Sequence, residues 1–296
     1  SSEPVPGLKP MRPIRMNLVR ITPSLGAEVE GLDLSKELSS AQIRALQTAF
    51  ETHHVLVFRD QTLSREAHKA FASYFGPIHV HPSKRNLKQD EDPDIFFIDI
   101  KPESKQSNGE TWHSDITCEA IPPYASMLYL TKVPENLGGD TLFANLQAAF
   151  EELSPDLQHY LMQQSAFHDG ELDLMRYGIR LKPGQSYPAH AHPAVIQHPK
   201  TKKPVLYVNE GFTAHLLGVP AFESNLILQG LFQRIRTNAR HQCRIKWTPN
   251  MITLWDNYSV QHQAIFDYSG YHRYGERITL ASDQAPQAYT VAAPSQ

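Results

Sequence analysis

The segment MITLWDNYSVQHQAIFDYSGYHRYGERITL, residues 251–280, decides how the fold of this 296-residue chain is interpreted. Its two ends, residues 251–257 and 277–280, are short and rich in apolar, β-branched or aromatic side chains, which is typical of strands. Between and beside them stand His262, Arg273 and Arg277. The segment therefore places three chemically active side chains next to two predicted strands.

The rest of the chain alternates similar strands with a few helices. Ser39 followed by Gln42 forms a capping-box pattern before a helical stripe, and Ser154 before Pro155 fits the start of another helix. Helices are expected at residues 39–54, 64–76, 145–164 in two pieces, and 221–237; strands are expected at 55–58, 95–100, 125–133, 140–146, 193–198, 203–209, 242–247, 251–257 and 277–282. Many short strands with helices grouped early and between them predict a mainly β fold, a barrel or jelly roll decorated by helices.

The net charge and the hydropathy of the chain restrict the classes of molecule that it could bind. The formal net charge is −3 and the isoelectric point is about 6.6, so no basic surface indicates nucleic acid or an anionic membrane. No apolar run approaches the roughly 18 residues needed to span a bilayer. We therefore expect a small-molecule partner, no nucleic acid and no membrane.

Cysteine usage and the N-terminal segment bear on compartment and domain organisation. Cys118 and Cys243 are the two cysteines, too few for a disulfide framework, and we interpret both as free thiols, although a single bridge stays open. The proline-rich start lacks a secretory signal pattern. We expect a cytoplasmic protein with a flexible extension at residues 1–17 and one domain at residues 18–296.

A second segment, GETWHSDITCEAIPP at residues 109–123, sets His113 and Asp115 two residues apart. On extended backbone, alternate side chains project to the same side, so the pair could share one ion. His-x-Asp is common by chance, and a third ligand is needed. His262 supplies it, and two imidazoles with one carboxylate suit a divalent metal that keeps open positions.

With these residues in view, the chain resembles the taurine dioxygenase family of iron(II)- and 2-oxoglutarate-dependent oxygenases, which includes alkylsulfatases and phenoxyacetate dioxygenases. Seven matching segments follow in the family's order, GAEVEGLDLSKELS, HHVLVFRDQTLS, FGPIHVHP, WHSDIT, PENLGGDTLFAN, HPAVIQHPKTKKPVLYVNEGFT and WDNYSVQH. Together they extend from about residue 18 to residue 280. The resemblance implies a double-stranded β-helix, a cupin-like jelly roll, flanked by helices.

The resemblance also implies a cofactor set and its residues. His113, Asp115 and His262 would hold Fe²⁺, and O₂ would be the second substrate. Thr141 and Arg273 would bind the far carboxylate of 2-oxoglutarate, a role that suits the planar, two-pronged guanidinium group. Thr141 could instead simply follow a Gly-Gly turn, and Arg273 could be a surface arginine in a salt bridge.

Four further residues would contact the substrate by the same resemblance. Arg277 and His81 match positions that contact an anionic group, Phe212 matches a position that lines the substrate pocket, and Asn108 could replace a family asparagine if its loop shifts. Arg277 could alternatively pair with Glu276, and Phe212 could be a core residue. Arg273 and Arg277 are four residues apart and should share one side of a strand.

Three departures from the taurine pattern bear on the substrate. Lys84 replaces a tyrosine, Cys118 replaces an aromatic residue, and Gly109 replaces an asparagine. These changes remove groups that would hold a small zwitterion and suggest room for a longer tail. We therefore expect an alkyl sulfate or organosulfonate, hydroxylated next to its heteroatom with release of sulfate or sulfite and an aldehyde. An aryloxy- or other carboxylate is the alternative.

Other possibilities remain at the level of sequence. The same three ligands could serve a zinc hydrolase or a non-catalytic, ligand-binding barrel. Residues 168–191 are rich in Gly, Pro and polar side chains and could form a lid over the site, with His190 and His192 as loop residues. By analogy with the family, a homo-oligomer, a dimer or tetramer, is expected.

Overall fold

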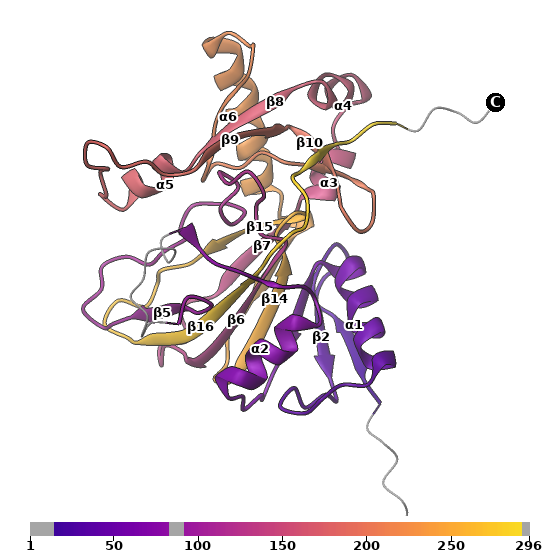
Figure 1. Cartoon of the computed structure of the whole chain (residues 1–296), viewed down its shortest axis with the longest axis vertical. Coiled ribbons are helices and arrows are strands. Elements are labelled where there is room, and N and C mark those ends of the chain that lie inside the picture. The colour runs from indigo at the N-terminus through magenta and orange to yellow at the C-terminus, as the bar shows by residue number, and fades with distance from the viewer. Residues whose placement is uncertain (1–14, 83–91, 292–296) are drawn as a thin grey trace, which may run out of the picture.

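Two sheets that lie against each other form the centre of the computed structural model, which describes residues 15–82 and 92–291 (Figure 1). Within those residues the larger sheet has eight strands in the order β1-β2-β3-β14-β6-β16-β4, and β5 also pairs with β16. Their bounds are β1 Asn17–Arg20, β2 Ala27–Glu30, β3 Val55–Phe58, β4 Ile78–His79, β5 Phe96–Ile100, β6 Ala125–Lys132, β14 Met251–Asp256 and β16 Arg273–Leu280.

The smaller central sheet has the order β13-β7-β15 and is antiparallel throughout. Its strands are β7 Thr141–Asn145, β13 Gln242–Ile245 and β15 Val260–Ala264. In β15, His262 lies opposite Phe143 of β7. The sequence interpretation placed His262 after a strand, whereas the structure places it within a strand of its own.

Two further three-stranded sheets lie in the upper half of Figure 1. Their strands are β8 Ser165–Asp169, β9 Ala189–Pro193, β10 Val195–Gln197, β11 Pro204–Leu206, β12 Thr213–Leu216 and β17 Gln287–Ala288. The helices are α1 Ser40–His53, α2 Arg65–Ser73, α3 Leu146–Glu151, α4 Pro155–Met162, α5 Gly170–Arg176 and α6 Ala221–Thr237, with the 3-10 turn η2 at Ala239–His241. Helices α1 and α2 lie beside the larger sheet, and α3 to α6 lie in the upper half of Figure 1.

Local sequence signals explain where several helices begin. The Ser39 side chain accepts a hydrogen bond from the Gln42 backbone, and the Gln42 side chain accepts one from the Ser39 backbone, so the predicted capping box of α1 is confirmed. Ser154 caps α4 and Pro155 occupies its first turn, as predicted. These caps satisfy backbone N–H groups that the first helical turn leaves free.

The core joins the helices to the larger sheet. Phe50 of α1 and Phe71 of α2 are almost fully buried and meet Phe75 edge to face, with ring centroids 5.6 and 5.7 Å apart. Each buried aromatic side chain contributes roughly 1.5–3 kcal/mol of hydrophobic stabilisation. The apolar faces of α1 and α2 therefore pack these two helices against the larger sheet, which carries part of the site.

The prediction of a mainly β fold with flanking helices is confirmed, but one prediction about loops is wrong. Residues 168–191 contain helix α5 and most of strand β9, and His190 and His192 lie in β9 rather than in a loop. The ring of His192 is buried and hydrogen-bonds to the backbone oxygens of Thr117 and Glu119. Pairing with β8 creates this strand, and such pairing is invisible in a composition rich in Gly, Pro and polar residues.

Two smaller points complete the comparison. Strand β1 begins at Asn17, and residues 1–14 lie outside the described residues, so the flexible extension stays a prediction. Within the described ranges, every helix is too short or too polar to traverse a bilayer.

Candidate metal and cosubstrate site

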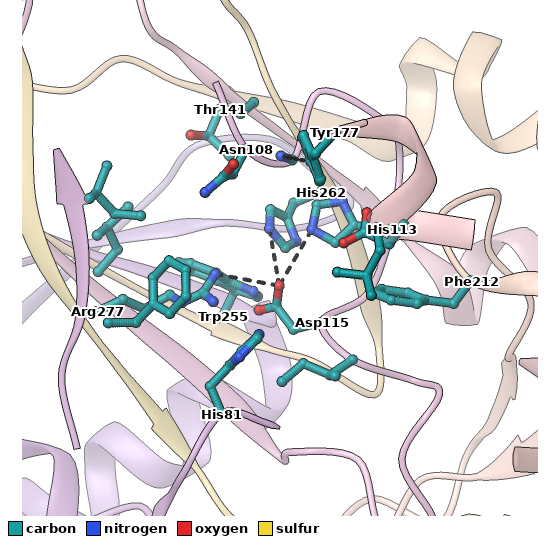
Figure 2. Close-up of a pocket in the computed structure, with 18 of the residues that line it drawn as sticks. His81, Asn108, His113, Asp115, Thr141, Tyr177, Phe212, Trp255, His262 and Arg277 are labelled. Atoms are coloured by element: carbon teal, nitrogen blue, oxygen red, sulfur yellow. Dashed lines mark hydrogen bonds and ion pairs between the residues drawn. The ribbon is translucent and has the colours of Figure 1, made fainter. Parts of the chain in front are cut away.

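A cavity of about 270 Å³ lies between the two central sheets and is partly covered by the segment that contains α5 (Figure 2). Strands of both sheets contribute to its wall. The lining residues are His81, Phe96, Ile98, Asn108, Gly109, His113, Asp115, Ile116, Leu128, Thr141, Asp173, Leu174, Tyr177, Ile179, Tyr187, Phe212, Trp247, Trp255, His262, Ala264, Arg273 and Arg277. All nine residues predicted for the site are among them.

The two histidines are joined through their backbones. His113 forms an isolated antiparallel bridge with His262, in which each backbone N–H donates to the other residue's carbonyl oxygen, at 3.0 and 2.8 Å. Their ring centroids are 4.2 Å apart. Residues distant in the chain are thus held directly opposite each other, which orients both imidazoles into the cavity.

Asp115 is positioned by hydrogen bonds from neighbouring side chains and not by strand pairing. The expected continuous strand through His113 and Asp115 is wrong, because the chain enters a turn at Asp115 and Ile116 has a φ of +49°. The side chain of Asn257 bonds both the N–H and the carbonyl of Asp115, at 2.6 and 2.8 Å. Ser126 donates to Asp115 Oδ2 at 2.7 Å, which leaves Oδ1 directed at the histidines.

The three predicted ligands converge. Asp115 Oδ1 lies 3.4 Å from His113 Nε2 and 3.6 Å from His262 Nε2, and one ligand atom from each residue lies within 4.8 Å of the others. His113 Nδ1 donates to the Thr111 carbonyl at 2.6 Å, which fixes the tautomer whose Nε2 has a free lone pair. Figure 2 shows the three side chains pointing at one position.

The protonation of these groups suits a cation. Burial lowers the pKa of His262 to about 3, so its ring is neutral at physiological pH. Burial alone would raise the pKa of Asp115, but the Arg277 guanidinium and the two imidazoles outweigh it and hold that pKa well below its usual range. Burial alone would lower the pKa of His113, but its contacts with Asp115 outweigh burial and raise that pKa, so a bound metal ion would displace the proton of the His113 ring. Two imidazole nitrogens and one carboxylate then fit a divalent ion such as Fe²⁺ with positions left open.

Arg273 is a buried cation that has no anionic partner among the residues that the structure describes. It is 6% exposed, its Nε has no hydrogen-bond partner, and no described carboxylate lies within ion-pair distance. Burial lowers the pKa of Arg273, yet an arginine side chain stays protonated at neutral pH. An uncompensated buried charge is costly, so the side chain indicates that an anion binds in the cavity.

Arg277 is the second guanidinium in the cavity, on the same side of β16 as Arg273. Its Nη1 is 3.6 Å from Asp115 Oδ1, and its charge lies 4.7 Å from the centroid of the Phe96 ring. The alternative pairing with Glu276 is absent, because Glu276 binds Arg65 at 2.6 Å on the other face of the strand.

The remaining predicted residues surround the open space. The His81 ring is tilted by 50° against the Phe96 ring, with centroids 5.2 Å apart, and the Phe212 ring lies 6.4 Å from the His113 ring. Asn108 lines the cavity beside Gly109. Lys84, which replaces a tyrosine of the taurine pattern, and its neighbour Arg85 lie outside the described residues.

Sequence reasoning expected extra room at two positions, and the structure supports this at one of them. Gly109 lines the cavity with a φ of +81°, and a Cβ there would lie 3.1 Å from His113 Cε1. Cys118 is fully buried and packs with Ile116 and Phe212, so it is not part of the wall.

The covering segment contributes residues that were missed as site residues. Asp173, Leu174, Tyr177, Ile179 and Tyr187 line the cavity. Tyr177 Oη accepts a hydrogen bond from the Gly109 N–H at 2.7 Å and so ties the segment to the loop before the ligands. In the sequence, the only indication for these residues is that they lie in residues 168–191, the segment interpreted as a possible lid over the site.

Comparison with known proteins gives the family. The sequence profile of the Taurine catabolism dioxygenase TauD, TfdA family matches residues 17–279. The chain belongs to this family. An alpha-ketoglutarate-dependent sulfonate dioxygenase of Saccharomyces cerevisiae is 30% identical, over 91% of this chain and 68% of that protein. An alkylsulfatase of Acinetobacter baylyi is 32% identical, over 93% of this chain and 88% of that protein.

A solved structure agrees with this membership. A taurine dioxygenase from Burkholderia xenovorans matches with a TM-score of 0.76 and 28% identity, over 92% of each chain. The predicted jelly-roll fold is therefore confirmed. As a member of the TauD, TfdA family, the chain is a 2-oxoglutarate-dependent dioxygenase that requires Fe²⁺ and O₂, which disfavours the zinc-hydrolase and non-catalytic alternatives.

Proposed function

We propose that this dioxygenase hydroxylates the carbon next to the heteroatom of a small organic sulfate ester or sulfonate. The observation that carries the proposal is the pair of guanidinium groups facing one metal-ligand triad. Among the described residues no carboxylate lies within ion-pair distance of Arg273, and the one within that distance of Arg277 belongs to the proposed metal ligand Asp115. Two anions are therefore needed in the cavity, and 2-oxoglutarate is only one of them.

The residues divide the two anions between them. Thr141 and Arg273 would hold the far carboxylate of 2-oxoglutarate, whose keto acid end would reach toward His113, Asp115 and His262. Arg277 and His81 would bind the anionic group of the substrate. Iron bound by the triad supplies O₂ activation and C–H hydroxylation, while 2-oxoglutarate is oxidised to succinate and CO₂. The protein contributes placement and charge.

The products follow from the position of the new hydroxyl group. A carbon that bears both a hydroxyl and a sulfate ester oxygen, or a hydroxyl and a sulfonate sulfur, is unstable. Loss of the hydroxyl proton forms a C=O bond as the bond to the heteroatom breaks, and the heteroatom group leaves with its electron pair. The products are an aldehyde and sulfate or sulfite.

The apolar wall limits the other end of the substrate. Ile116, Leu174, Ile179, Tyr187 and Phe212 line the cavity on the side of the covering segment. An alkyl tail would bury apolar surface there at roughly 25 cal/mol per Å². A carboxylate on an aryl ether could use the same two cationic side chains, and it remains the second candidate.

A matched panel tests the proposal. Butyl sulfate, butanesulfonate, pentanoate and butanol share one tail and differ in the head group. We expect 2-oxoglutarate-dependent O₂ uptake and succinate formation with the sulfur anions, with release of sulfate or sulfite and an equal amount of aldehyde. Arg277→Met should raise KM for these anions much more than for 2-oxoglutarate. Turnover restricted to the uncharged alcohol would refute the proposal.

Three broader predictions from the sequence are also proposed. We propose a single domain at residues 18–296, a homo-oligomer and a cytoplasmic location. Exposed Phe222 and Leu226 on α6 support an oligomer, and two buried free cysteines support a reducing compartment. Limited proteolysis, sedimentation velocity and cell fractionation test them in turn.

A further inference from the structure

Trp247 touches both residues assigned to the far carboxylate of 2-oxoglutarate. It follows β13 by two residues, and β13 pairs with β7 so that Ile245 lies opposite Thr141. The indole is 6% exposed and lines the cavity. Its Nε1 donates to Thr141 Oγ1 at 3.0 Å, and its ring centroid lies 5.6 Å from the Arg273 guanidinium carbon.

The hydrogen bond decides what the Thr141 hydroxyl can do. A hydroxyl group has one proton to donate and two lone pairs to accept with, whereas an indole N–H can only donate. Because Trp247 occupies a lone pair, the hydroxyl proton of Thr141 must point elsewhere. Within the described residues Thr141 Oγ1 has no second hydrogen bond, so the proton is available to the cavity. A carboxylate, which only accepts, complements it.

The ring face has a separate effect on Arg273. The indole provides a favourable cation–π contact without a negative charge. A protein carboxylate at that place would also stabilise the guanidinium, but it would compete with the ligand. The aromatic face thus holds the guanidinium while leaving its charge free for an incoming carboxylate.

The backbone that leads into Trp247 is anchored to the residue just before Thr141. Arg244 Nε and Lys246 Nζ bind the two oxygens of buried Asp140 at 2.7 and 3.1 Å, and Lys246 also donates to the Leu137 carbonyl at 2.6 Å. Asp140 immediately precedes Thr141. This clamp, Asp140 with Arg244 and Lys246, fixes the distance between the indole and the threonine.

We propose that Trp247 is a positioning residue for the far carboxylate of 2-oxoglutarate, acting through its N–H on Thr141 and through its ring on Arg273. The proposal rests on the cosubstrate assignment of those two residues. It differs from a purely structural role, in which Trp247 would only fill the apolar cluster that also contains Leu25 and Trp255. A structural role would affect all ligands of the site alike.

The test is binding, not turnover. The Fe(II)-loaded protein is titrated without O₂ and without substrate, using 2-oxoglutarate and, separately, 2-oxopentanoate, which has the same keto acid end but no far carboxylate. Calorimetry and the visible charge-transfer band of the chelate give the affinities. Trp247→Phe keeps a ring and removes the N–H; Thr141→Val removes the hydroxyl; the double variant removes both.

We expect Trp247→Phe to weaken 2-oxoglutarate binding about 5- to 20-fold, as loss of one oriented charge-assisted hydrogen bond would. The affinity for 2-oxopentanoate should change less than 2-fold. Thr141→Val should weaken 2-oxoglutarate binding similarly, and the double variant should be within about 2-fold of Thr141→Val, because the two side chains act through one hydrogen bond. With saturating 2-oxoglutarate, kcat of Trp247→Phe should stay near that of the unaltered protein.

The contrary outcomes are distinct. Equal weakening of both ligands by Trp247→Phe, or effects that multiply in the double variant, would overturn the proposal. Arg240→Met is the control, since Arg240 is an exposed residue of η2, just before β13, and lies outside both the cavity and the clamp; a loss as large as that of Trp247→Phe would mean that general displacement of this edge of the sheet is the cause and would also overturn the proposal. Failure of the unaltered protein to prefer 2-oxoglutarate over 2-oxopentanoate would instead refute the assignment of Thr141 and Arg273.

Discussion

The ligand side of the cavity and its covering segment are built in different ways. On the ligand side, backbone hydrogen bonds between His113 and His262 and the double contact of Asn257 with Asp115 fix the geometry. In the covering segment, residues 168–191, strand pairing holds the two ends, whereas side chains attach the end of helix α5 to the loops beside the ligands. Tyr177 binds the Gly109 N–H, and Arg176 donates to the carbonyls of Glu210 and Gly211. The metal ligands are thus fixed by backbone pairing and by buried side-chain contacts, whereas the part of the covering segment that lies over the cavity is attached by a few side chains between two paired ends.

Removing a ligand should have the largest effect. Asp115→Ala deletes the carboxylate that neutralises the metal, so we expect iron affinity to collapse and 2-oxoglutarate-dependent O₂ uptake to fall on the order of 1000-fold. Metal analysis and an oxygen electrode measure both. The control is Asp99→Ala, which removes a carboxylate of β5 that pairs with His272. This variant should leave iron affinity and O₂ uptake unchanged. Retention of activity by Asp115→Ala would remove the ligand assignment altogether.

Ser126→Ala tests the support of the ligand side. Ser126 Oγ donates to Asp115 Oδ2, and loss of such an outer contact typically weakens metal affinity about 10- to 100-fold. The matched control is Thr253→Val on neighbouring β14, since the Thr253 hydroxyl is equally buried but has no hydrogen-bond partner. Competition with a chelator gives the affinity. Equal losses in the two variants would show that packing, not the contact with Asp115, matters.

Tyr177→Phe tests the covering segment. The variant removes the acceptor for the Gly109 N–H, and a hydrogen bond of about 1 kcal/mol predicts roughly a 5-fold fall in kcat/KM for the organic substrate. Iron affinity should not change. Exposed Tyr271→Phe serves as the control. A loss of iron affinity as large as that of Ser126→Ala would show that the two regions are not separable.

The smallest expected effect is on folding stability at acidic pH. It concerns a residue outside the cavity, so it tests the fold without altering the site. Burial lowers the pKa of His68 in α2 to about 4, and both ring nitrogens lack hydrogen-bond partners. Because the folded state disfavours the protonated ring, His68 costs no stability above pH 6.5. Below pH 6.5 the unfolded state gains protons first, and stability falls progressively until about pH 4.

His68→Leu should remove this dependence. At pH 5.5 the histidine costs about 1.4 kcal/mol, so the variant's melting temperature should decline less between pH 7 and pH 5.5 than that of the unaltered protein. Activity at pH 7 should be unchanged, since His68 does not line the cavity. Parallel declines in the two proteins would show that another group controls acid unfolding.

Local patterns explain what could be predicted from the sequence. The capping box at Ser39 and the proline start of α4 depend on residues within one helical turn. The His-x-Asp spacing is common by chance, and the ligands His113, Asp115 and His262 were found because a third ligand and collinear segments resemble one family. Arg273 was placed by the resemblance to the family, and the lack of a carboxylate near it among the described residues now gives that placement a physical reason.

What was missed depends on contacts between distant segments. Strand β9 exists because β8 is beside it, and the role of Trp247 depends on a strand pairing that brings it to Thr141. Tyr177 reaches Gly109 only after α5 has folded over the cavity. None of these positions carries a distinctive local pattern, so only the folded arrangement reveals them.

The bridge between His113 and His262 also governs when the protein can acquire its metal. During synthesis, a chain that has emerged only as far as β13 has two of the three ligands and no partner to align them. Iron capture must therefore wait until β15 has left the ribosome and paired with β7. A chain truncated before β15 would therefore lack both the third ligand and the pairing that aligns it.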